Sequence, residues 1–210
     1  MQRVLKRAID LVGASIGLLI FAIPMVIIAT LVRLSLGSPI IFRQPRPGLH
    51  GRTFEIYKFR TMRDTPDADS SPLSNKLRVT PLGRFLRRAS LDELPELVNV
   101  LRGEMSLVGP RPLRVEYLER YTPEQARRHS VLPGITGWAQ IKARNRLTWD
   151  ERLALDIWYV DHASTWLDLK ILMQTVFELV RRADRSDDGL DVPEFLGTAD
   201  RGHAPNGRMT

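Results

Sequence analysis

Residues 11–32 form a stretch of 22 residues without a single charge, and this stretch limits the fold more than any other feature. As a helix, it is long enough to cross a hydrocarbon layer about 30 Å thick. Basic residues precede it, so a secretory signal peptide is the rival interpretation. However, the stretch is too long for the apolar part of a signal peptide, and no small-residue cleavage site follows it cleanly. The sequence therefore predicts a membrane segment, which we place at residues 1–36.

The path of this segment has two interpretations. Pro24 lies just past the middle, where it frees the carbonyl group of Ile20 and bends the helix. Basic flanks favour the cytoplasmic side, and here they occur at both ends: Arg3, Lys6 and Arg7 before, and Arg33, Arg43 and Arg46 after. A re-entrant helix–break–helix that returns to the same face keeps both flanks on that side. A straight crossing with a kink is the alternative, and these features alone leave the two even.

Charge and composition restrict the partners. The chain has 210 residues, enough for one domain with a sizeable core, and a net charge of +7. Residues 1–63 hold ten Lys and Arg residues and only two acids, Asp10 and Glu55. A basic N-terminal third suggests an anionic partner, such as a phospholipid surface, a nucleic acid or a phosphorylated substrate. The absence of cysteine excludes disulfides and thiolate metal sites and fits a reducing compartment.

Beyond the membrane segment, the pattern predicts a mostly helical α+β domain over residues 37–183. Two β-like runs, residues 40–44 and 54–60, flank a turn-rich segment and favour a hairpin. Helix starts are indicated by threonine or serine caps, some followed by proline, at Thr80, Thr122, Thr148 and Ser164. We also expect an amphipathic helix over residues 113–121 and an extended piece over residues 135–141.

The end of the chain and one internal segment are less regular. The last helix, residues 165–182, carries an apolar stripe that faces a core or lies partly in the membrane interface. Residues 64–76 are rich in turn formers and predict a loop, whose aspartates are more often solvated than metal-binding. Residues 184–210 turn polar, and we expect a flexible tail.

An acidic pair, Asp92 and Glu93, lies between two basic features, namely a cluster of Arg84, Arg87 and Arg88, and Arg111. Ser90 and Glu93 match a capping box, in which each side chain binds a backbone N–H group, and this structural role explains most such patterns. Pro95 complicates it, because a proline at the fifth helical position removes a backbone hydrogen bond. We therefore expect the pair on a distorted first turn with free N–H groups, which is a ready anion site.

The turn Gly109-Pro110-Arg111-Pro112 is the second unusual feature. Two prolines fix the backbone around one arginine, so its guanidinium group has little entropy to lose, and its planar fork suits a phosphate. A proline-rich turn with an incidental arginine is the alternative. Lys58 either faces a phosphate as well or rests in solvent or on lipid headgroups. No Walker-type loop, zinc spacing or Ser/His/Asp signature is present in the sequence.

Six stretches together resemble those of the monotopic bacterial sugar transferases, or polyprenyl-phosphate phosphoglycosyl transferases. The resemblance runs from residue 6 to about residue 180 and is to the minimal form, with one N-terminal hydrophobic segment and a catalytic domain. The matching stretches are Lys6-Arg7-Ala8-Ile9-Asp10, Tyr57-Lys58-Phe59-Arg60-Thr61-Met62, Ser90-Leu91-Asp92-Glu93-Leu94-Pro95, Met105-Ser106-Leu107-Val108-Gly109-Pro110-Arg111-Pro112, Pro133-Gly134-Ile135-Thr136-Gly137-Trp138 and Trp158-Tyr159-Val160.

The resemblance implies a reaction and a site. A UDP-sugar gives its phosphosugar to a polyprenyl (undecaprenyl) phosphate, forming polyprenyl-diphosphate-sugar and UMP. Asp92 corresponds to the nucleophile, which forms a covalent phosphosugar intermediate. Glu93 corresponds to the second acid, implicated in Mg²⁺ and lipid-phosphate handling, so the pair is the expected metal site. The remaining expected site residues are Lys58, Arg87, Arg88 and Arg111 for phosphate binding, and Asp168, Ser90 and Pro95 in support.

The resemblance also implies a setting. It favours a re-entrant segment with its break at Pro24, and a catalytic domain on the cytoplasmic face of the bacterial inner membrane. The expected role is the first membrane step of a glycan pathway, such as exopolysaccharide or lipopolysaccharide biosynthesis. The implied partners are the membrane, the UDP-sugar and the polyprenyl phosphate, with no nucleic acid, and a homodimer is left open.

One departure from the family pattern and two rival functions remain. Residues 142–145 read Lys-Ala-Arg-Asn where we expect Asn-Gly-Arg-Asn, so Lys142 and Ala143 leave the choice of sugar donor open. A membrane-anchored adaptor would use the basic face to bind anionic lipid or nucleic acid. A membrane-bound hydrolase of nucleotide sugars would release UMP without a lipid acceptor.

Overall fold

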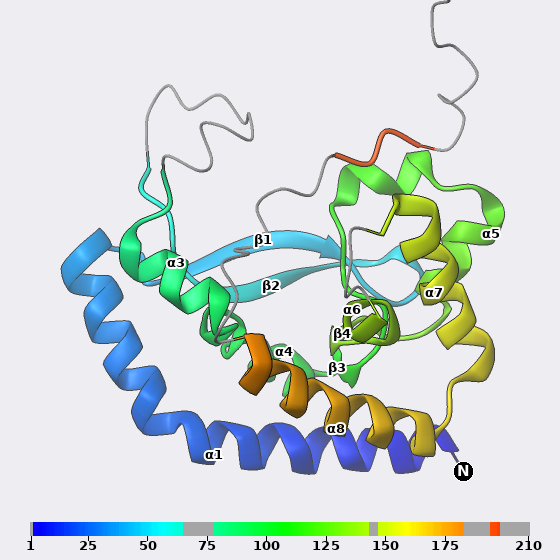
Figure 1. The fold of residues 1–210 in the computed structure, drawn as a ribbon, viewed down its shortest axis with the longest axis horizontal. Helices are drawn as coiled ribbons and strands as arrows, with labels where there is room; N and C mark the ends of the chain where they lie inside the picture. The colour runs from blue at the N-terminus through cyan, green and yellow to red at the C-terminus, as the bar shows by residue number, and fades with distance from the viewer. Residues whose placement is uncertain (1, 65–77, 143–146, 183–193, 198–210) are drawn as a thin grey trace, which may run out of the picture.

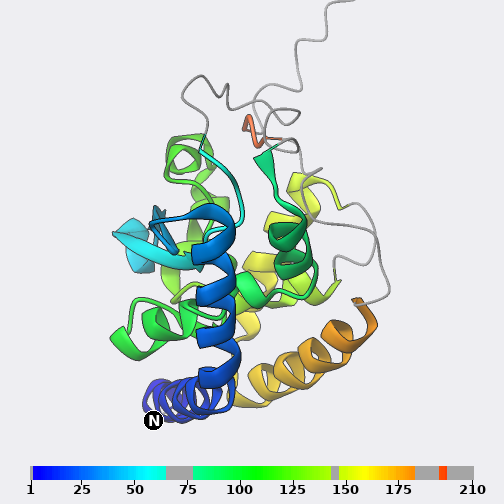
Figure 2. The same ribbon diagram turned by 90° about the vertical axis from the view of Figure 1, so that its left-hand side faces the viewer.

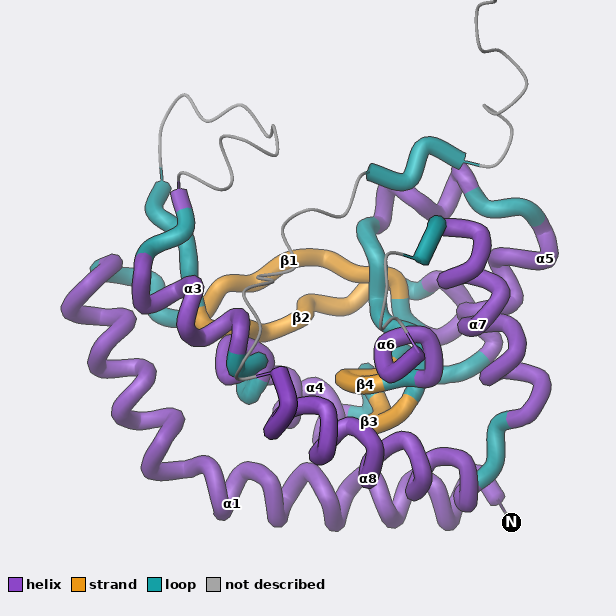
Figure 3. The backbone as a smooth tube through the Cα atoms, viewed as in Figure 1, coloured by secondary structure: helices purple, strands orange, loops and turns teal. Residues whose placement is uncertain are grey.

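The computed structural model describes residues 2–64, 78–142, 147–182 and 194–197. Helices dominate it and small sheets lie among them, so the predicted mostly helical α+β fold is confirmed (Figures 1 and 3). In chain order, the helices and strands are α1 (Gln2–Leu36), β1 (Ile41–Pro47), β2 (Thr53–Phe59), α3 (Pro81–Arg88), α4 (Glu96–Arg102), β3 (Ser106–Val108), α5 (Pro123–Ala126), β4 (Gly134–Thr136), α6 (Trp138–Lys142), α7 (Trp149–His162) and α8 (Thr165–Arg182).

The apolar stretch forms α1, a helix of 35 residues with Pro24 in its interior. Figures 1 and 2 show that α1 bends, so that its first half runs along one side of the domain and its second half turns along another. A proline inside a helix removes a backbone hydrogen bond and is a common cause of such a bend. Among the described residues, α1 is the one helix long and apolar enough to cross a membrane, and 11% of its apolar window is buried. The re-entrant path stays a prediction.

Each half of α1 packs on a different part of the domain. In the first half, Ala14 joins a cluster with Ile56, Leu97, Val100 and Met105. The second half packs Ile28 and Val32 on Phe59 of β2 and Leu86 of α3. The side of α1 away from the domain leaves large apolar side chains exposed, among them Val12, Ile16, Leu19, Ile20, Ile23, Val26 and Ile27. The helix therefore supports β2, α3 and α4 on one side and offers an apolar surface on the other.

Charged residues in the first half of α1 bind the domain. The Asp10 carboxylate accepts hydrogen bonds from a hydroxyl and an amide of β3, both at 2.9 Å. Arg7 donates to two carbonyl groups at the C-terminal end of α4, and Lys6 Nζ lies 2.7 Å from Asp168 of α8. Lys6 and Arg7 therefore no longer support a re-entrant path as a basic flank, because both side chains have partners inside the domain.

The predicted hairpin is confirmed as an antiparallel pair, β1 with β2, in which Ile41 faces Phe59 and Pro47 faces Thr53. A second sheet pairs β3 with β4 in parallel. The expected extended piece over residues 135–141 is wrong beyond Thr136. The strand β4 ends at Thr136, because its partner β3 is only three residues long, and α6 begins at Trp138. The expected amphipathic helix over residues 113–121 is instead a 3₁₀ helix, Val115–Arg120, without a side-chain cap.

The predicted helix starts are confirmed. The Thr80 hydroxyl accepts a hydrogen bond from the Gly83 amide, and Pro81 follows it at the first helical position. Thr122 and Thr148 each form a complete capping box. The Ser164 hydroxyl accepts a hydrogen bond from an amide in the first turn of α8 at 3.3 Å. Local capping chemistry therefore sets the start of α3, α5, α7 and α8.

The stripe on the last helix divides between two surroundings. Leu167 and Ile171 of α8 are buried in a core cluster, whereas other apolar side chains of the helix stay exposed, namely Trp166, Leu169, Met173, Val176 and Phe177. Figures 1 and 2 place α8 and the first half of α1 on the same face of the molecule. That face is rich in exposed apolar side chains from both helices.

The predicted tail is only partly within the described residues. Residues 194–197 do not fit a flexible tail, because Phe195 is 2% exposed and packs against Tyr117, Tyr121 and Trp149. Residues 183–193 and 198–210 lie outside the described part of the chain, as does the predicted loop at residues 64–76 beyond Asp64.

Candidate active site

The acid pair lies on a short 3₁₀ helix, Leu91–Glu93, between α3 and α4. The predicted capping box is wrong, because the Ser90 side chain makes no capping hydrogen bond and its backbone is left-handed, with φ 54°. Ser90 instead ends α3, and its amide donates to the Arg87 carbonyl. Pro95 precedes the first residue of α4, where its missing N–H group costs little. The expected distortion at Pro95 therefore takes the form of a separate turn that carries Asp92 and Glu93.

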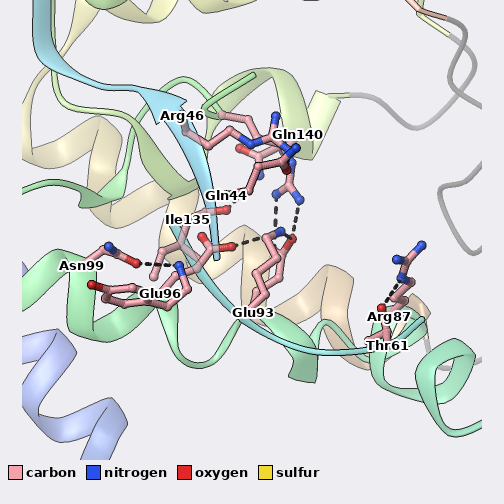
Figure 4. A network of polar contacts seen from close by, with 12 residues as sticks. Gln44, Arg46, Thr61, Arg87, Glu93, Glu96, Asn99, Ile135 and Gln140 are labelled. Carbon is pink, nitrogen blue, oxygen red and sulfur yellow. Dashed lines mark hydrogen bonds and ion pairs between the residues drawn. The ribbon is translucent and has the colours of Figure 1, made fainter. Parts of the chain in front are cut away.

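Glu93 is held by two cations. Lys58 Nζ, from β2, lies 2.6 Å from Glu93 Oε1. Arg111 donates from both terminal nitrogens to the two carboxylate oxygens, and Figure 4 shows the network around Glu93. Burial alone would raise the pKa of Glu93, but the charges and hydrogen bonds of Arg111 and Lys58 outweigh burial and hold that pKa well below its usual range. Glu93 is therefore a fixed anion that orients both cations.

Asp92 has a different environment. Its side chain is 8% exposed, and no hydrogen bond or ion pair holds its carboxylate within the described part of the chain. Burial raises the pKa of Asp92, with Glu93 acting in the same direction, while Lys58, Arg87 and Arg111 act against the rise. Its oxygens are thus unpaired beside three cations. Such a carboxylate can attack a bound phosphate, whereas Glu93 has its lone pairs engaged.

A third carboxylate, Glu96, was not among the residues that the motifs indicate. It lies in the first turn of α4, is 1% exposed, and has Oε1 at 3.1 Å from Lys58 Nζ. This contact is an ion pair without hydrogen-bond geometry. Burial, together with Glu93, raises the pKa of Glu96 to about 7. Its position three residues after Glu93 on a helical path is the one signal in the sequence that could have indicated it.

The two predicted arginines of α3 lie in different places. Arg87 Nε donates to the Thr61 hydroxyl at 2.9 Å, and Arg87 is among the charges that act on Asp92. Arg88 is exposed, and no described contact brings it to the acid pair. The structure therefore gathers Lys58, Arg87 and Arg111 around the pair, and the role of Arg88 stays a prediction.

The turn that carries Arg111 is fixed from three sides. The Gly109 amide donates to Thr136 of β4 at 2.9 Å, and the Gly134 amide donates to Pro110 at 3.0 Å. Arg128, which is buried, donates to the Arg111 carbonyl at 2.8 Å. Arg128 in turn forms an ion pair of 2.7 Å with buried Asp156 of α7. Sequence patterns gave no indication of this pair, because its partners are 28 residues apart and neither lies in a motif.

Asp168 supports the same turn. It accepts hydrogen bonds from Lys6 at 2.7 Å and from the Tyr159 hydroxyl at 2.6 Å. Both donors also bond the carbonyl group of Val108, which directly precedes the turn. Asp168 therefore links α1, α7 and α8 next to Val108, at the start of the turn. None of its described contacts reaches the acid pair.

The acid pair offers few ligands for the expected Mg²⁺ ion. In the described ranges, no group of three or more His, Cys, Asp or Glu side chains is arranged to hold a metal ion. Mg²⁺ commonly binds through one or two carboxylates and completes its shell with water and substrate phosphates. Asp92 has open oxygens, and Glu93 is adjacent but engaged by Lys58 and Arg111. The pair therefore fits an ion bound by only one or two carboxylates, with Asp92 as the open one.

Comparison with known proteins identifies relatives. The family model described as bacterial sugar transferase matches residues 1–182. The chain is 48% identical over 198 residues to the "Uncharacterized sugar transferase EpsL" of Bacillus subtilis (strain 168), covering 94% of this chain and 98% of that protein. It is 43% identical over 187 residues to the "UDP-glucose:undecaprenyl-phosphate glucose-1-phosphate transferase" of Escherichia coli (strain K12), covering 84% of this chain and 40% of that protein.

A further relative is the "Undecaprenyl-phosphate galactose phosphotransferase" of Salmonella typhimurium, 40% identical over 198 residues, with 86% of this chain and 41% of that protein covered. The chain thus spans nearly all of the B. subtilis relative and about two fifths of the other two. The range matched by the family model, residues 1–182, contains the acid pair, the cations around it and the apolar helix. The chain therefore belongs to the bacterial sugar transferase family.

Proposed function

We propose that the protein transfers a phosphosugar from a UDP-sugar to undecaprenyl phosphate, giving undecaprenyl-diphosphate-sugar and UMP. Relatives named as UDP-glucose:undecaprenyl-phosphate and undecaprenyl-phosphate galactose transferases support this substrate class. The reaction would be the first membrane step of a bacterial glycan pathway. The observation that carries the proposal is the contrast inside the acid pair: Asp92 has no partner among the described residues, whereas Glu93 is bound by Lys58 and Arg111.

The proposed first step uses the open carboxylate. An Asp92 oxygen attacks the phosphorus that bears the sugar, a P–O bond forms, and the bridging P–O bond breaks. UMP leaves with the electron pair of that bond, and Asp92 carries the phosphosugar as an acyl phosphate. In the second step, a phosphate oxygen of the lipid attacks the same phosphorus and releases the Asp92 carboxylate. The double displacement thus divides one difficult attack between two anions into two easier steps.

The cations around the pair explain how anions can approach each other. Lys58, Arg87 and Arg111 surround Asp92, and their charges offset the repulsion between a carboxylate and a diphosphate. Asp92 and Glu93 would hold Mg²⁺ together with the donor phosphates, and the bound ion supplies further charge neutralisation. Glu93 keeps Lys58 and Arg111 aimed at the place where phosphate binds. Asp92 is buried and the Glu93 side chain is only 15% exposed, which keeps these interactions strong.

The exposed apolar surfaces support a proposed membrane setting. A re-entrant α1, with the domain on the cytoplasmic face, would keep the site at the level of the lipid phosphates. There a soluble UDP-sugar and a membrane-bound acceptor can meet. The exposed apolar side chains of α1 and α8 on one face support this arrangement.

The test is UMP release from a panel of UDP-sugars with undecaprenyl phosphate and Mg²⁺. We expect Asp92→Asn to lower the rate by about three orders of magnitude or more, because the nucleophile is removed. Membrane binding of the variant should survive. Asp161→Asn is the matched control, since this carboxylate is 42% exposed and pairs with Arg127 on the surface. Normal turnover by Asp92→Asn would refute the proposal, and UMP release without lipid at the full rate would indicate a hydrolase.

A further inference from the structure

Arg46 of β1 is a second arginine beside Arg111, and the chain leaves it incompletely paired. Its Nη2 donates to the Gln44 side chain at 2.7 Å. Its Nε is buried and has no hydrogen-bond partner among the described residues. The Oε1 atom of Gln140 is buried and unpaired in the same way. Unsatisfied buried donors and acceptors are costly and rare, so a cluster of them indicates that a ligand completes their bonds.

The charges near Arg46 also favour an anion. Burial lowers the pKa of Arg46 to about 10, and the neighbouring charges of Arg111 and Arg114 act in the same direction. Glu96 and Glu116 act against them without restoring the usual value. Glu93 is already shared between Arg111 and Lys58. A bound anion beside Arg46 would therefore relieve repulsion among like charges that the protein itself leaves uncompensated.

The position of Arg46 distinguishes it from Arg87. Figure 4 shows Arg46, Gln44 and Gln140 together on one side of Glu93, and Arg87 with Thr61 on another. The cations that act on Asp92 are Lys58, Arg87 and Arg111, in that order, whereas those that act on Arg46 are Arg111 and Arg114. Arg111 is common to both sets. The group of cations around Asp92 therefore extends through Arg111 to Arg46.

The surroundings indicate which substrate enters from each side. Arg87 lies on α3, and the neighbouring Leu86 packs against Ile28 and Val32 of the membrane helix. A phosphate carried by a lipid would approach from that side. Arg46 lies near the turn of the hairpin, which in Figure 1 points towards α5, α6 and α7 and away from the second half of α1. A soluble nucleotide would approach from this side.

On the basis of the proposed function, we propose that Arg46 and Arg111 form the subsite for the nucleoside-bearing phosphate of the donor, the group that leaves as UMP. The phosphate that bears the sugar then lies between Arg111 and Asp92. When the bridging P–O bond breaks, the leaving phosphate gains a negative charge next to the Arg46 guanidinium. A planar arginine fork with an unpaired Nε is suited to bind that charge by two hydrogen bonds.

Direct titration of UMP into the full chain in detergent tests this subsite without requiring turnover. We expect Arg46→Gln to weaken UMP binding about tenfold or more, the usual effect of losing charged hydrogen bonds. Arg43→Gln is the matched control, because Arg43 lies on the same strand with its side chain 64% exposed. Steady-state assays should show a raised KM for the UDP-sugar and an unchanged KM for the lipid.

The outcomes are distinct. UMP affinity equal in Arg46→Gln, Arg43→Gln and the unaltered protein would overturn the subsite, as would a change confined to the KM of the lipid. No UMP binding by the unaltered protein would overturn it too. If Arg46→Gln does not fold, Arg46→Lys keeps the charge but lacks the fork, and we expect weaker binding from it as well. Failure to release UMP from any UDP-sugar would refute the proposed function, while the titration would still decide the subsite.

Discussion

Asp92 and Glu93 are adjacent and chemically alike, yet their surroundings give them opposite properties. The cations that hold Glu93 keep its pKa low, and burial raises the pKa of Asp92. The difference arises from geometry, because Glu93 reaches Lys58 and Arg111 within hydrogen-bond distance and Asp92 does not. In the proposed reaction, this separation of two neighbouring acids by their environments suits Asp92 to attack and Glu93 to the orientation of the cations.

Glu96 makes stability depend on pH in a definite direction. Its pKa is about 7 in the folded protein, against an ordinary value of 4.5. Between these pH values, the folded protein retains a proton that the unfolded chain loses, so the contribution of Glu96 to stability falls as pH rises. We expect Glu96→Gln to gain stability relative to the unaltered protein between about pH 4.5 and pH 7, by at most about 3 kcal/mol.

Thermal unfolding at several pH values across that range checks this expectation. Glu55→Gln is the control, because Glu55 is 57% exposed and forms a surface contact with Arg43. The expected signature is a difference in Tm between Glu96→Gln and the unaltered protein that grows with pH. Parallel Tm curves for the two proteins would contradict the assigned pKa of Glu96.

At the scale of elements, the turn between β3 and the following 3₁₀ helix depends on close backbone approach. A Cβ atom on Gly109 would lie 2.3 Å from the Leu132 carbonyl oxygen and 2.9 Å from the Gly134 amide nitrogen. Both are backbone atoms: Gly134 is the first residue of β4, paired in the parallel sheet, and Leu132 lies two residues before it, so neither can move without disturbing the start of β4. The position of Arg111 therefore depends on a residue without a side chain two positions earlier.

We expect Gly109→Ala to destabilise the protein by about 1–3 kcal/mol or more and to displace Arg111, because the added methyl group cannot be accommodated. Thermal unfolding and UMP release measure the two effects. Gly17→Ala is a suitable comparison, since a Cβ there meets only the flexible side chain of Leu97, at 3.1 Å. Unchanged Tm and unchanged turnover in the Gly109→Ala protein would show that the turn tolerates the methyl group.

Local chemistry explains which elements were predictable. Thr80, Thr122 and Thr148 start helices with their own hydroxyl groups, so their sequence patterns suffice. Ser90 has the same capping pattern, but it follows directly after α3. Its left-handed backbone conformation ends that helix, so its hydroxyl does not start the next one. The length of β4 depended on its partner β3, which lies far away in the chain. Signals within a few residues were therefore reliable, and those that depend on distant partners were not.

The same distinction applies to the site. Asp92, Glu93 and Arg111 stand out in short motifs, and the structure brings them together with Lys58. The roles of Arg46 beside Arg111 and of Arg128 with Asp156 behind the turn became visible only through contacts between distant segments, and for Glu96, which contacts Lys58, the sequence offered only its spacing from Glu93.

At the scale of the whole molecule, two helices form one apolar face. The first half of α1 and α8 share a face, and both expose large apolar side chains there, including Trp166 and Phe177. A face of this kind suits the boundary between headgroups and acyl chains. The second half of α1 turns away from this face. The topology therefore depends on whether the two ends of α1 lie on the same side of the membrane.

The absence of cysteine makes this topology directly measurable. We expect single cysteines at Gln2 and Ser38 to react with an impermeant thiol reagent from the same side of sealed membrane vesicles. This outcome follows from a re-entrant path, in which the bend at the middle of α1 returns the chain to its starting face. Labelling from opposite sides would instead establish a crossing helix, and a cysteine at exposed Arg43 provides the reference for the side of the domain.

Phe195 determines where the chain can be truncated at its C-terminal end. The family match ends at residue 182, yet the buried Phe195 ring lies beyond it and stacks on Tyr121. Tyr121 accepts a hydrogen bond from Arg128, which holds the Arg111 carbonyl. A recombinant protein cut at the family boundary would lose this ring and carry a phenyl-sized cavity, with a cost of about 3–5 kcal/mol. A stable truncated protein should therefore retain the chain through residue 197.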